Sequence, residues 1–200
     1  DYKSSLEINK LFFEILIAPE FDKKAIDVLV SKKNRIILLQ KKSIDRDSSF
    51  RNILNGVLHQ ETDTIENNSD NWEVVTENKA ESNEIEDLKF ANKIVKHSKS
   101  NAIVLVKNKQ MISSGVGQTS RVDALKFAID KAKVFKLDVR NSAMASDAFF
   151  PFPDCIEIAS RAGISSVVQP GGSIKDNLSV KACNDKGMSM YLSGIRHFYH

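Results

Sequence analysis

The sequence predicts an α/β fold with a mixed, mostly parallel sheet and helices on both of its faces. From residue 111 onward, short apolar stretches alternate with loops and with segments of helical periodicity, as in repeated strand–loop–helix units. Seven of the eight glycines and three of the four prolines lie beyond Gln110, where these units need turns. Such units place helices on both faces of a sheet and gather ligands at the carboxyl ends of its strands.

The first half of the chain begins with a predicted β-α-β unit. Apolar runs predict strands over 11–18 and 35–39, and apolar residues at helical spacing predict a helix over 22–31 between them. Residues 52–59 are predicted to pair at a sheet edge. Residues 61–71 are polar and without period, which indicates a surface loop or linker.

The second half is predicted as a regular succession of strands and helices. Strands are predicted over 72–76, 102–107, 111–114, 142–146, 164–169 and 188–193, and helices over 84–97, 122–135, 154–162 and 176–185. Asp154 can cap the third of these helices, and Gly163 and Gly187 follow the last two at the position that favours glycine.

Five polar or glycine-rich segments are predicted to meet at one edge of the sheet. Four of them follow strands, namely 115–121, 147–154, 169–173 and 194–198. If 102–107 and 111–114 form a hairpin, the pair 100–101 reaches the same edge. The fold alone does not require this convergence, which therefore marks the edge as a candidate ligand site.

Composition excludes several classes of protein. A formal net charge of +3 without a long basic run argues against a nucleic-acid partner. No uncharged apolar run is long enough to span a bilayer, so no membrane partner is expected. Cys155 and Cys183 are too few for a disulfide framework and lack zinc-ligand spacing, which favours a reducing, cytoplasmic location.

The stretch GVGQTSR at 115–121 allows two interpretations. It can cradle a phosphate at a helix N-terminus, or it can be a tight turn between a strand and a helix, which is the more common case. Arg121 opposes the dipole of the helix that it begins, so we expect an anionic ligand or a carboxylate beside it. The loop at 170–173 is equally open to a ligand or a turn interpretation, and Arg196 is a solvated charge or a phosphate ligand.

The stretch SDAFFPFPD at 146–154 fits neither a buried strand nor an ordinary turn. Two prolines would interrupt a sheet ladder, and three phenylalanines are out of place on a polar surface turn. An apolar loop with polar ends is typical of a ligand pocket. The sequence shows neither a G-x-S-x-G nucleophile motif nor the H-x-E and P-C-x-x-C motifs of zinc deaminases.

Five motifs in order resemble the C-terminal part of one enzyme family, the bifunctional AICAR transformylase/IMP cyclohydrolase of purine biosynthesis. They are KHSKSNAIV (96–104), GVGQTSRVDA (115–124), ASDAFFPFPD (145–154), VVQPGGSIKD (167–176) and GIRHFYH (194–200). The resemblance is strong over 83–200 and fainter before it.

The resemblance implies a formyltransferase that moves a formyl group from the co-substrate 10-formyltetrahydrofolate to AICAR, giving FAICAR, without a catalytic metal. It implies that residues 1–200 form the second of two cytidine-deaminase-like domains, a three-layer α/β/α sandwich. The family works as a homodimer whose site is shared between subunits, so AICAR, folate and a second copy are the expected partners.

The resemblance also implies roles for nine residues. Asn101 would be catalytic and orient the AICAR carboxamide and the formyl group. The AICAR-binding residues would be Asn101, Arg121, Arg196 and Phe198, with Arg196 on the phosphate. The folate-binding residues would be Phe149, Pro151, Phe152, Asp154 and Ser173.

The sequence departs from the family at two kinds of position. Pro153 stands where the family often has arginine, and Cys155 where it has a small or amide residue, so we expect both to alter the folate edge. The family's catalytic Lys-His pair lies in an F-K-H-V-S-P motif of the first transformylase domain, and that motif is absent from this sequence. Lys96-His97 is interpreted as a chance match to the Lys-His pair of that motif. His97 is expected to have a structural role or to interact with the helix dipole.

Two alternatives to a working transformylase half remain open at this point. The chain can be a non-catalytic domain that binds nucleotide and dimerises but is inactive alone. A zinc-free deaminase-like binding module is the weaker alternative, because five motifs match the transformylase in order.

Overall fold

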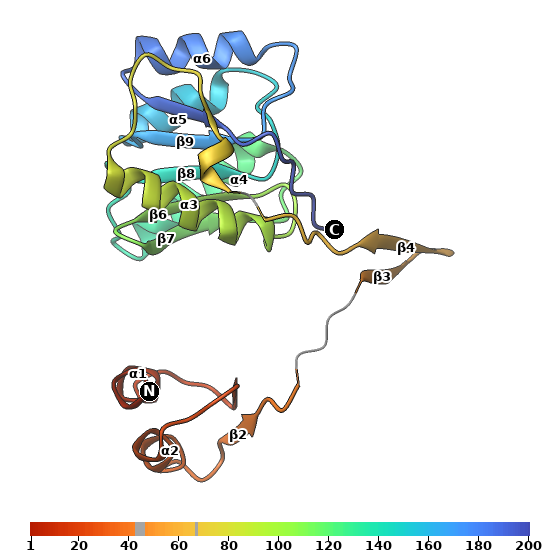
Figure 1. Cartoon of the computed structure of the whole chain (residues 1–200), viewed down its shortest axis with the longest axis vertical. Coiled ribbons are helices and arrows are strands. Elements are labelled where there is room, and N and C mark those ends of the chain that lie inside the picture. The colour runs from red at the N-terminus through yellow and green to blue at the C-terminus, as the bar shows by residue number, and fades with distance from the viewer. Residues whose placement is uncertain (43–46, 67) are drawn as a thin grey trace. The chain divides into compact units, whose positions relative to one another are not determined.

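The computed structural model describes residues 1–42, 47–66 and 68–200, which form two compact units, Asp1–Thr62 and Asp63–His200. We expected one domain over 1–200 with a loop or linker at 61–71. The boundary between the units falls inside that segment, and the two units are described separately below (Figure 1).

The first unit contains the expected β-α-β arrangement, preceded by a helix that the sequence pattern did not predict. Its elements are α1 (Tyr2–Asn9), β1 (Ile15–Ala18), α2 (Lys23–Leu29), β2 (Ile36–Leu39), β3 (Ser48–Ile53) and β4 (Gly56–Glu61). Strands β1 and β2 pair in parallel, and β3 and β4 form an antiparallel hairpin in place of the single edge strand expected over 52–59. The turn between them places Leu54 at a positive φ of 49°.

The second unit contains a six-stranded mixed sheet. Its strands are β5 (Glu73–Val74), β6 (Ile103–Lys107), β7 (Gln110–Gly115), β8 (Ala143–Ser146), β9 (Ser166–Gln169) and β10 (Ser189–Leu192), in the order β5-β10-β9-β8-β6-β7. Strands β8, β9 and β10 pair in parallel, and the expected β6–β7 hairpin is antiparallel. Because β6 is antiparallel to both β7 and β8, the strands β7 to β10 all share one direction.

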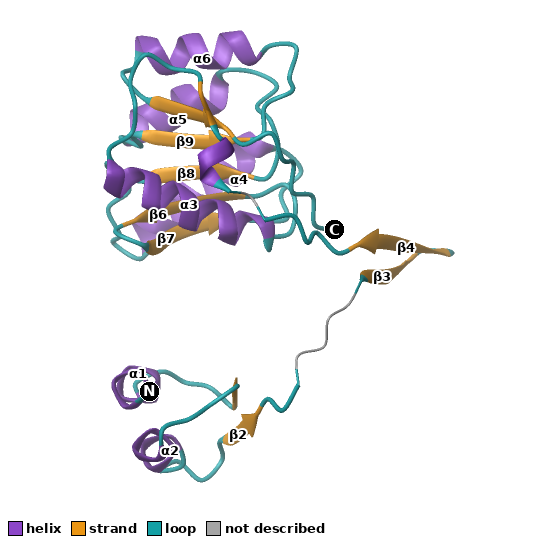
Figure 2. Ribbon diagram, in the orientation of Figure 1, coloured by secondary structure: helices purple, strands orange, loops and turns teal. Residues whose placement is uncertain are grey.

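Helices cover both faces of this sheet, giving three layers (Figure 2). They are the 3-10 helix η1 (Ser69–Asn71) and the α-helices α3 (Ser82–Lys96), α4 (Arg121–Val134), α5 (Asp154–Ala162) and α6 (Asp176–Asp185). Helices α4, α5 and α6 contribute to one buried core, and α3 contributes to the other.

Alternation along β6 explains how one strand serves both cores. Ile103 and Leu105 lie in the core of α4, whereas Val104 and Val106 lie in the core of α3. Successive side chains of a strand point to opposite faces, so a continuous apolar run is the pattern that a sheet covered on both sides requires. The α/β class and the mixed sheet predicted from the sequence are confirmed.

Helix ends follow the sequence closely, with one correction. Gly163 and Gly187 adopt positive φ values of 84° and 68° at the ends of α5 and α6, as expected. The prediction that Asp154 caps α5 is wrong, because Pro153 occupies the cap position and Asp154 is the first helical residue. Its carboxylate accepts a hydrogen bond from the backbone N–H of Cys155 at 2.9 Å and lies in the first turn, where the helix dipole favours it.

Candidate functional site at the edge of the sheet

The five predicted segments meet at one edge of the second unit's sheet. Ile103, at the start of β6, pairs with Gly115 at the end of β7 and with Ser146 at the end of β8. Gln169 and Leu192, the last residues of β9 and β10, pair with each other. The loops that follow these strands therefore leave the sheet side by side with residues 100–101, and we call this edge the rim.

Asn101 and the loop after β7 hold each other in place. The Asn101 side-chain amide donates to the backbone carbonyls of Gln118 at 3.0 Å and Thr119 at 3.2 Å. The backbone N–H of Gln118 donates to Asn101 and that of Gly117 donates to Lys99, at 3.3 and 2.7 Å. These contacts occupy the amide nitrogen of Asn101 and leave its side-chain oxygen as the acceptor available to a ligand.

The same contacts bear on the two interpretations of the GVG stretch. A phosphate cradle needs free backbone N–H groups, but those of Gly117 and Gln118 are already used within the protein. A Cβ atom on Gly115 would lie 1.9 Å from the carbonyl oxygen of Ala124, so glycine is needed for α4 to pack on β7. The geometry favours the turn interpretation.

Arg121 has the carboxylate neighbour that its position predicts. It is the first residue of α4, and its Nη2 atom lies 3.2 Å from Oδ1 of Asp147. The Asp147 side chain is fully buried and that of Arg121 is 13% exposed. Among the described residues, Arg121 Nε and Asp147 Oδ2 are buried without a hydrogen-bond partner, so this ion pair retains hydrogen-bonding capacity.

The C-terminal tail is fixed to the rim by its backbone. His197 N–H donates to the Asp147 carbonyl at 2.9 Å, and Ser100 N–H donates to the Tyr199 carbonyl at 2.8 Å. These bonds place Arg196 and Phe198 next to the Asn101 and Arg121 loops. The Arg196 guanidinium lies 4.2 Å from the centre of the Phe198 ring, and that of Arg121 lies 5.9 Å from it.

A carboxylate from the start of the unit holds the tail from its other side. His197 is 1% exposed, and its Nδ1 atom lies 2.5 Å from Oδ2 of Asp63. Lys96 Nζ lies 3.5 Å from the other oxygen of Asp63 and donates to the Ile65 carbonyl at 2.8 Å. Burial raises the pKa of Asp63, but the hydrogen bond and charge of His197, with the charge of Lys96, outweigh it and leave this pKa below its usual value.

The loop after β8 divides its aromatic side chains between the core and the surface. Phe150 is fully buried, Phe149 is half-buried, and Phe152 is 51% exposed. Lys175 Nζ lies 4.4 Å above the Phe152 ring, which joins this loop to the loop after β9. Phe149, Phe152 and the exposed Pro151 can therefore face a ligand, whereas Phe150 anchors the loop.

The loop after β9 is closed by Asp176 rather than by a ligand. The N–H groups of Gly172 and Ser173 donate to Asp176 Oδ2 at 2.7 and 3.0 Å. The Ser173 hydroxyl accepts from the N–H of Lys175 at 3.2 Å. The N–H groups of this turn are thus engaged within the protein, and Ser173 is half-buried.

Neither cysteine is a candidate nucleophile. Cys155 and Cys183 are both free and fully buried in the core. Burial raises the pKa of each thiol to about 12, with the nearby Asp154 charge adding to the effect at Cys155. The Cys155 side chain lies in the core, and its expected effect on folate binding stays a prediction.

Sequence reasoning missed three residues that build the rim, namely Asp63, Asp147 and His197. Asp147 could have been found, since it directly follows a buried strand of the predicted sheet. Asp63 and His197 are 134 positions apart, and no motif spacing joins them. His197 lies in the segment 194–198 that was predicted at this edge, but its pairing with Asp63 had no signal in the sequence.

Comparison with known proteins decides the family. A family model described as AICARFT/IMPCHase bienzyme matches residues 1–131. The chain belongs to this family. The expected resemblance is therefore confirmed, and the wider setting is bifunctional purine biosynthesis.

Relatives are similar along the whole chain. The bifunctional purine biosynthesis protein PurH of Bacteroides thetaiotaomicron is 57% identical over 201 residues, and those of Persephonella marina and Acetivibrio thermocellus are 43% and 46% identical. Each match covers 100% of this chain and 39% of the relative, so the chain spans about two fifths of the relatives' length.

Two solved structures also match part of the chain. The dCMP deaminase of cyanophage S-TIM5 is 15% identical, with a TM-score of 0.40, over 55% of this chain and 98% of that chain. RibD of Acinetobacter baumannii is 16% identical, with a TM-score of 0.39, over 54% of this chain and 35% of that chain. Neither similarity bears on substrate or reaction. None of the described helices is long and apolar enough to cross a membrane.

Proposed function

We propose that the chain is the part of an AICAR transformylase that supplies nucleotide- and folate-binding residues. The enzyme would transfer a formyl group from 10-formyltetrahydrofolate to the amine of AICAR, giving FAICAR. In this proposal residues 63–200 correspond to the second transformylase domain. The cytoplasmic location remains a prediction.

The observation that carries the proposal is that the four residues expected to bind the nucleotide meet at the rim. Asn101 bonds the loop that leads to Arg121, and Arg121 lies near Phe198. The Arg196 guanidinium lies over the same Phe198 ring. Four residues from three distant parts of the sequence meet where α/β sheets bind ligands.

The rim can recognise the nucleotide through charge and planarity. Arg196 is exposed and can fork a phosphate with two parallel hydrogen bonds. Phe198 offers a ring face to the base, and the Asn101 side-chain oxygen can accept from an N–H group of the carboxamide or amine. Arg121 is held by Asp147 while part of its hydrogen-bonding capacity stays unused.

The folate would lie against the loop after β8. Phe149, Pro151 and Phe152 offer apolar surface to a flat ring, and the carboxylate of Asp154 can accept from ring N–H groups. Ser173 follows on the neighbouring loop, which Lys175 joins to Phe152. Holding the two substrates in reacting geometry is the main task in such a transfer, and we propose that it needs no catalytic metal.

The structure offers no support for a catalytic role of Lys96-His97. The Lys96 amine is engaged by the Ile65 carbonyl and by Asp63. Both residues line a cavity over α3, and the contact of Lys96 with the rim is its ion pair with Asp63. We therefore propose that formyl transfer needs the family's F-K-H-V-S-P motif, absent from this sequence, and a homodimer in which the site is shared.

Calorimetric titration of AICAR into the 200-residue chain tests the nucleotide part. We expect binding, and we expect Arg196→Ala to weaken it by about 1.5–3 kcal/mol because a charged hydrogen bond to phosphate is lost. Arg161→Ala is the matched control, because Arg161 is a 77%-exposed arginine on α5 that pairs with Glu157. Equal affinities of the two variants would contradict the role of Arg196.

A formyl-transfer assay tests the catalytic part. We expect no turnover from the 200-residue chain and turnover from a longer form that contains the F-K-H-V-S-P motif. Turnover by the 200-residue chain alone would refute the requirement for that motif. If neither form bound AICAR, the proposed function would be refuted. If the longer form bound AICAR without turnover, a non-catalytic nucleotide-binding domain would be favoured.

A further inference from the structure

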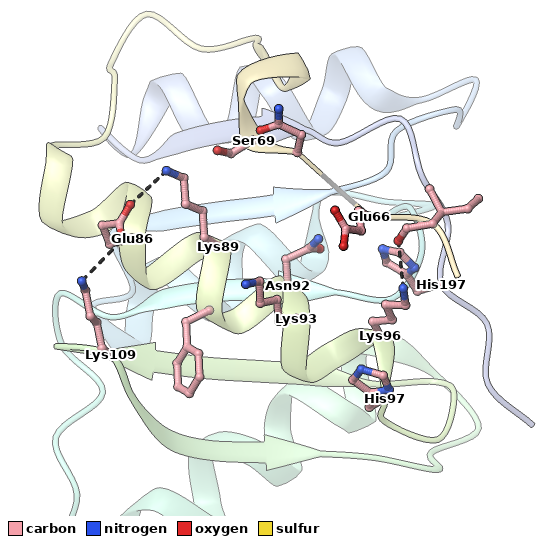
Figure 3. A pocket seen from close by; sticks show the side chains of 13 residues that line it. Glu66, Ser69, Glu86, Lys89, Asn92, Lys93, Lys96, His97, Lys109 and His197 are labelled. Carbon is pink, nitrogen blue, oxygen red and sulfur yellow. Dashed lines mark hydrogen bonds and ion pairs between the residues drawn. The ribbon is translucent and has the colours of Figure 1, made fainter. Parts of the chain in front are cut away.

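A second candidate site lies over α3, on the side of the sheet opposite α4. Its cavity volume is about 840 Å³, within the range of small-molecule sites. Figure 3 shows Lys89, Asn92 and Lys96 on α3 and Glu66 and Ser69 on the chain segment that lies across from it. None of the residues expected at the rim lines this cavity, although His197 does.

The walls of the cavity are predominantly cationic. Four lysines line it, namely Lys89, Lys93, Lys96 and Lys109, against the two carboxylates Glu66 and Glu86. Glu86 is shared by Lys89 at 2.9 Å and Lys109 at 3.4 Å. Within the described part of the chain, the Lys93 amine has neither an ion pair nor a hydrogen bond, which leaves a full positive charge for a ligand.

A polar side chain of α3 that lines the cavity has no hydrogen-bond partner among the described residues. Asn92 is only 4% exposed and lines the cavity, and none of the described residues hydrogen-bonds its side chain. The Asn92 side-chain amide can donate two hydrogen bonds and accept two, and it lines the cavity.

Apolar surface completes the lining. Phe90 and Ile65 line the cavity and remain 37% and 55% exposed. A free phosphate ion would use the lysines and Asn92 but would leave this apolar surface in water. A ligand with both an anionic group and a flat apolar group would use all of it.

We propose that the cavity over α3 binds the phosphate monoester of a flat, aromatic organic molecule. The phosphate lies at Lys93 and the Asn92 amide, two adjacent donors of α3 that line the cavity and that no described residue engages. The aromatic part lies against Phe90 and Ile65. The two groups that hold the phosphate are not among the residues assigned to the rim, although His197 belongs to both sites.

NMR titration of the isotope-labelled 200-residue chain with phenyl phosphate tests the proposal. We expect saturable shifts of the Asn92 side-chain amide and of the backbone amides of Lys93 and His97. Lys93→Gln should weaken binding about tenfold and Asn92→Leu about fivefold, as expected for one charged and one neutral hydrogen-bonding group. Inorganic phosphate should bind more weakly than phenyl phosphate, and phenol should not compete.

Two control variants separate this site from general charge and from the rim. Lys131→Gln removes a lysine from the last turn of α4, as Lys93→Gln does on α3, and should leave phenyl phosphate binding unchanged. Arg196→Ala should also leave it unchanged while weakening AICAR binding. The proposal is overturned if phenyl phosphate does not saturate, if Lys93→Gln matches Lys131→Gln, or if Arg196→Ala abolishes the shifts.

Discussion

Replacing Gly115 with alanine tests whether the contact between β7 and α4 organises the rim. A Cβ atom at Gly115 would lie 1.9 Å from the Ala124 carbonyl oxygen, 2.7 Å from its carbonyl carbon and 3.0 Å from its Cα. All three are backbone atoms of α4, so no side chain can rotate away. The helix must instead move from the strand, by about 1.5 Å to reach ordinary van der Waals contact.

The energetic cost follows from how tightly this helix is packed. Leu125 and Ala128 of α4 are fully buried, so the helix cannot shift without disturbing the core beneath it. Overpacking of a well-packed core costs about 1–3 kcal/mol, and a backbone clash belongs at the upper end of that range. We expect Gly115→Ala to lower the free energy of unfolding by about 3 kcal/mol.

Urea unfolding measures this change, followed by fluorescence of Trp72 and by circular dichroism. Trp72 is the single tryptophan, 8% exposed in the core of the second unit, so its emission reports on that unit. Gly56→Ala is the control, because a Cβ there would lie 3.8 Å from the Ile53 carbonyl, an ordinary contact. A Gly115→Ala midpoint equal to that of the unmodified chain would refute the reasoning.

Two further predictions concern groups whose pKa the fold changes. Asp63→Ala leaves the buried His197 ring without its carboxylate and should lower the free energy of unfolding by about 2 kcal/mol at pH 7. The pKa of Asp63 is lower in the folded chain than in the unfolded chain, so this stabilisation is present above the unfolded pKa of about 4 and is lost as pH falls through the folded pKa. Urea unfolding of the unmodified chain and of Asp63→Ala at pH 7 and pH 3 measures the loss. A difference in unfolding free energy between the two proteins that is the same at both pH values would contradict the ion-pair reasoning. Burial raises the pKa of Cys155 and Cys183 to about 12. A thiol reagent at pH 8 should therefore label neither cysteine in the native chain and both in urea. Rapid labelling of the native chain would contradict their burial.

Much of the second unit could be predicted because its signals are local. The periodicity of apolar residues located α3 and α4, and the glycines at 163 and 187 marked helix ends that require a positive φ. The position of Arg121 against its helix dipole correctly predicted a nearby anion, which is Asp147. Each of these inferences depends on residues within one or two turns of a helix.

The remaining features depend on contacts that no local pattern encodes. The SDAFFPFPD stretch showed that its phenylalanines needed apolar contact, but not that Phe150 would turn into the core while Phe152 stayed at the surface. The need for glycine at 115 arises from the approach of Ala124, which only the packed helix reveals. The contact between Asp63 and His197 joins the two ends of one unit, so only the folded chain identifies it.

The division of the chain at Thr62/Asp63 gives the proposed site a clear boundary. Every residue assigned to the rim, from Asp63 to Phe198, belongs to the second unit, which has its own two-sided core. A fragment of residues 63–200 should therefore fold and bind AICAR within about twofold of the 200-residue chain, a difference of about 0.4 kcal/mol. Calorimetry measures the affinity, and Trp72 emission checks the fold. Native emission with lost AICAR binding would show that the first unit contributes to the site, and would refute the assignment of the nucleotide ligands to the rim alone.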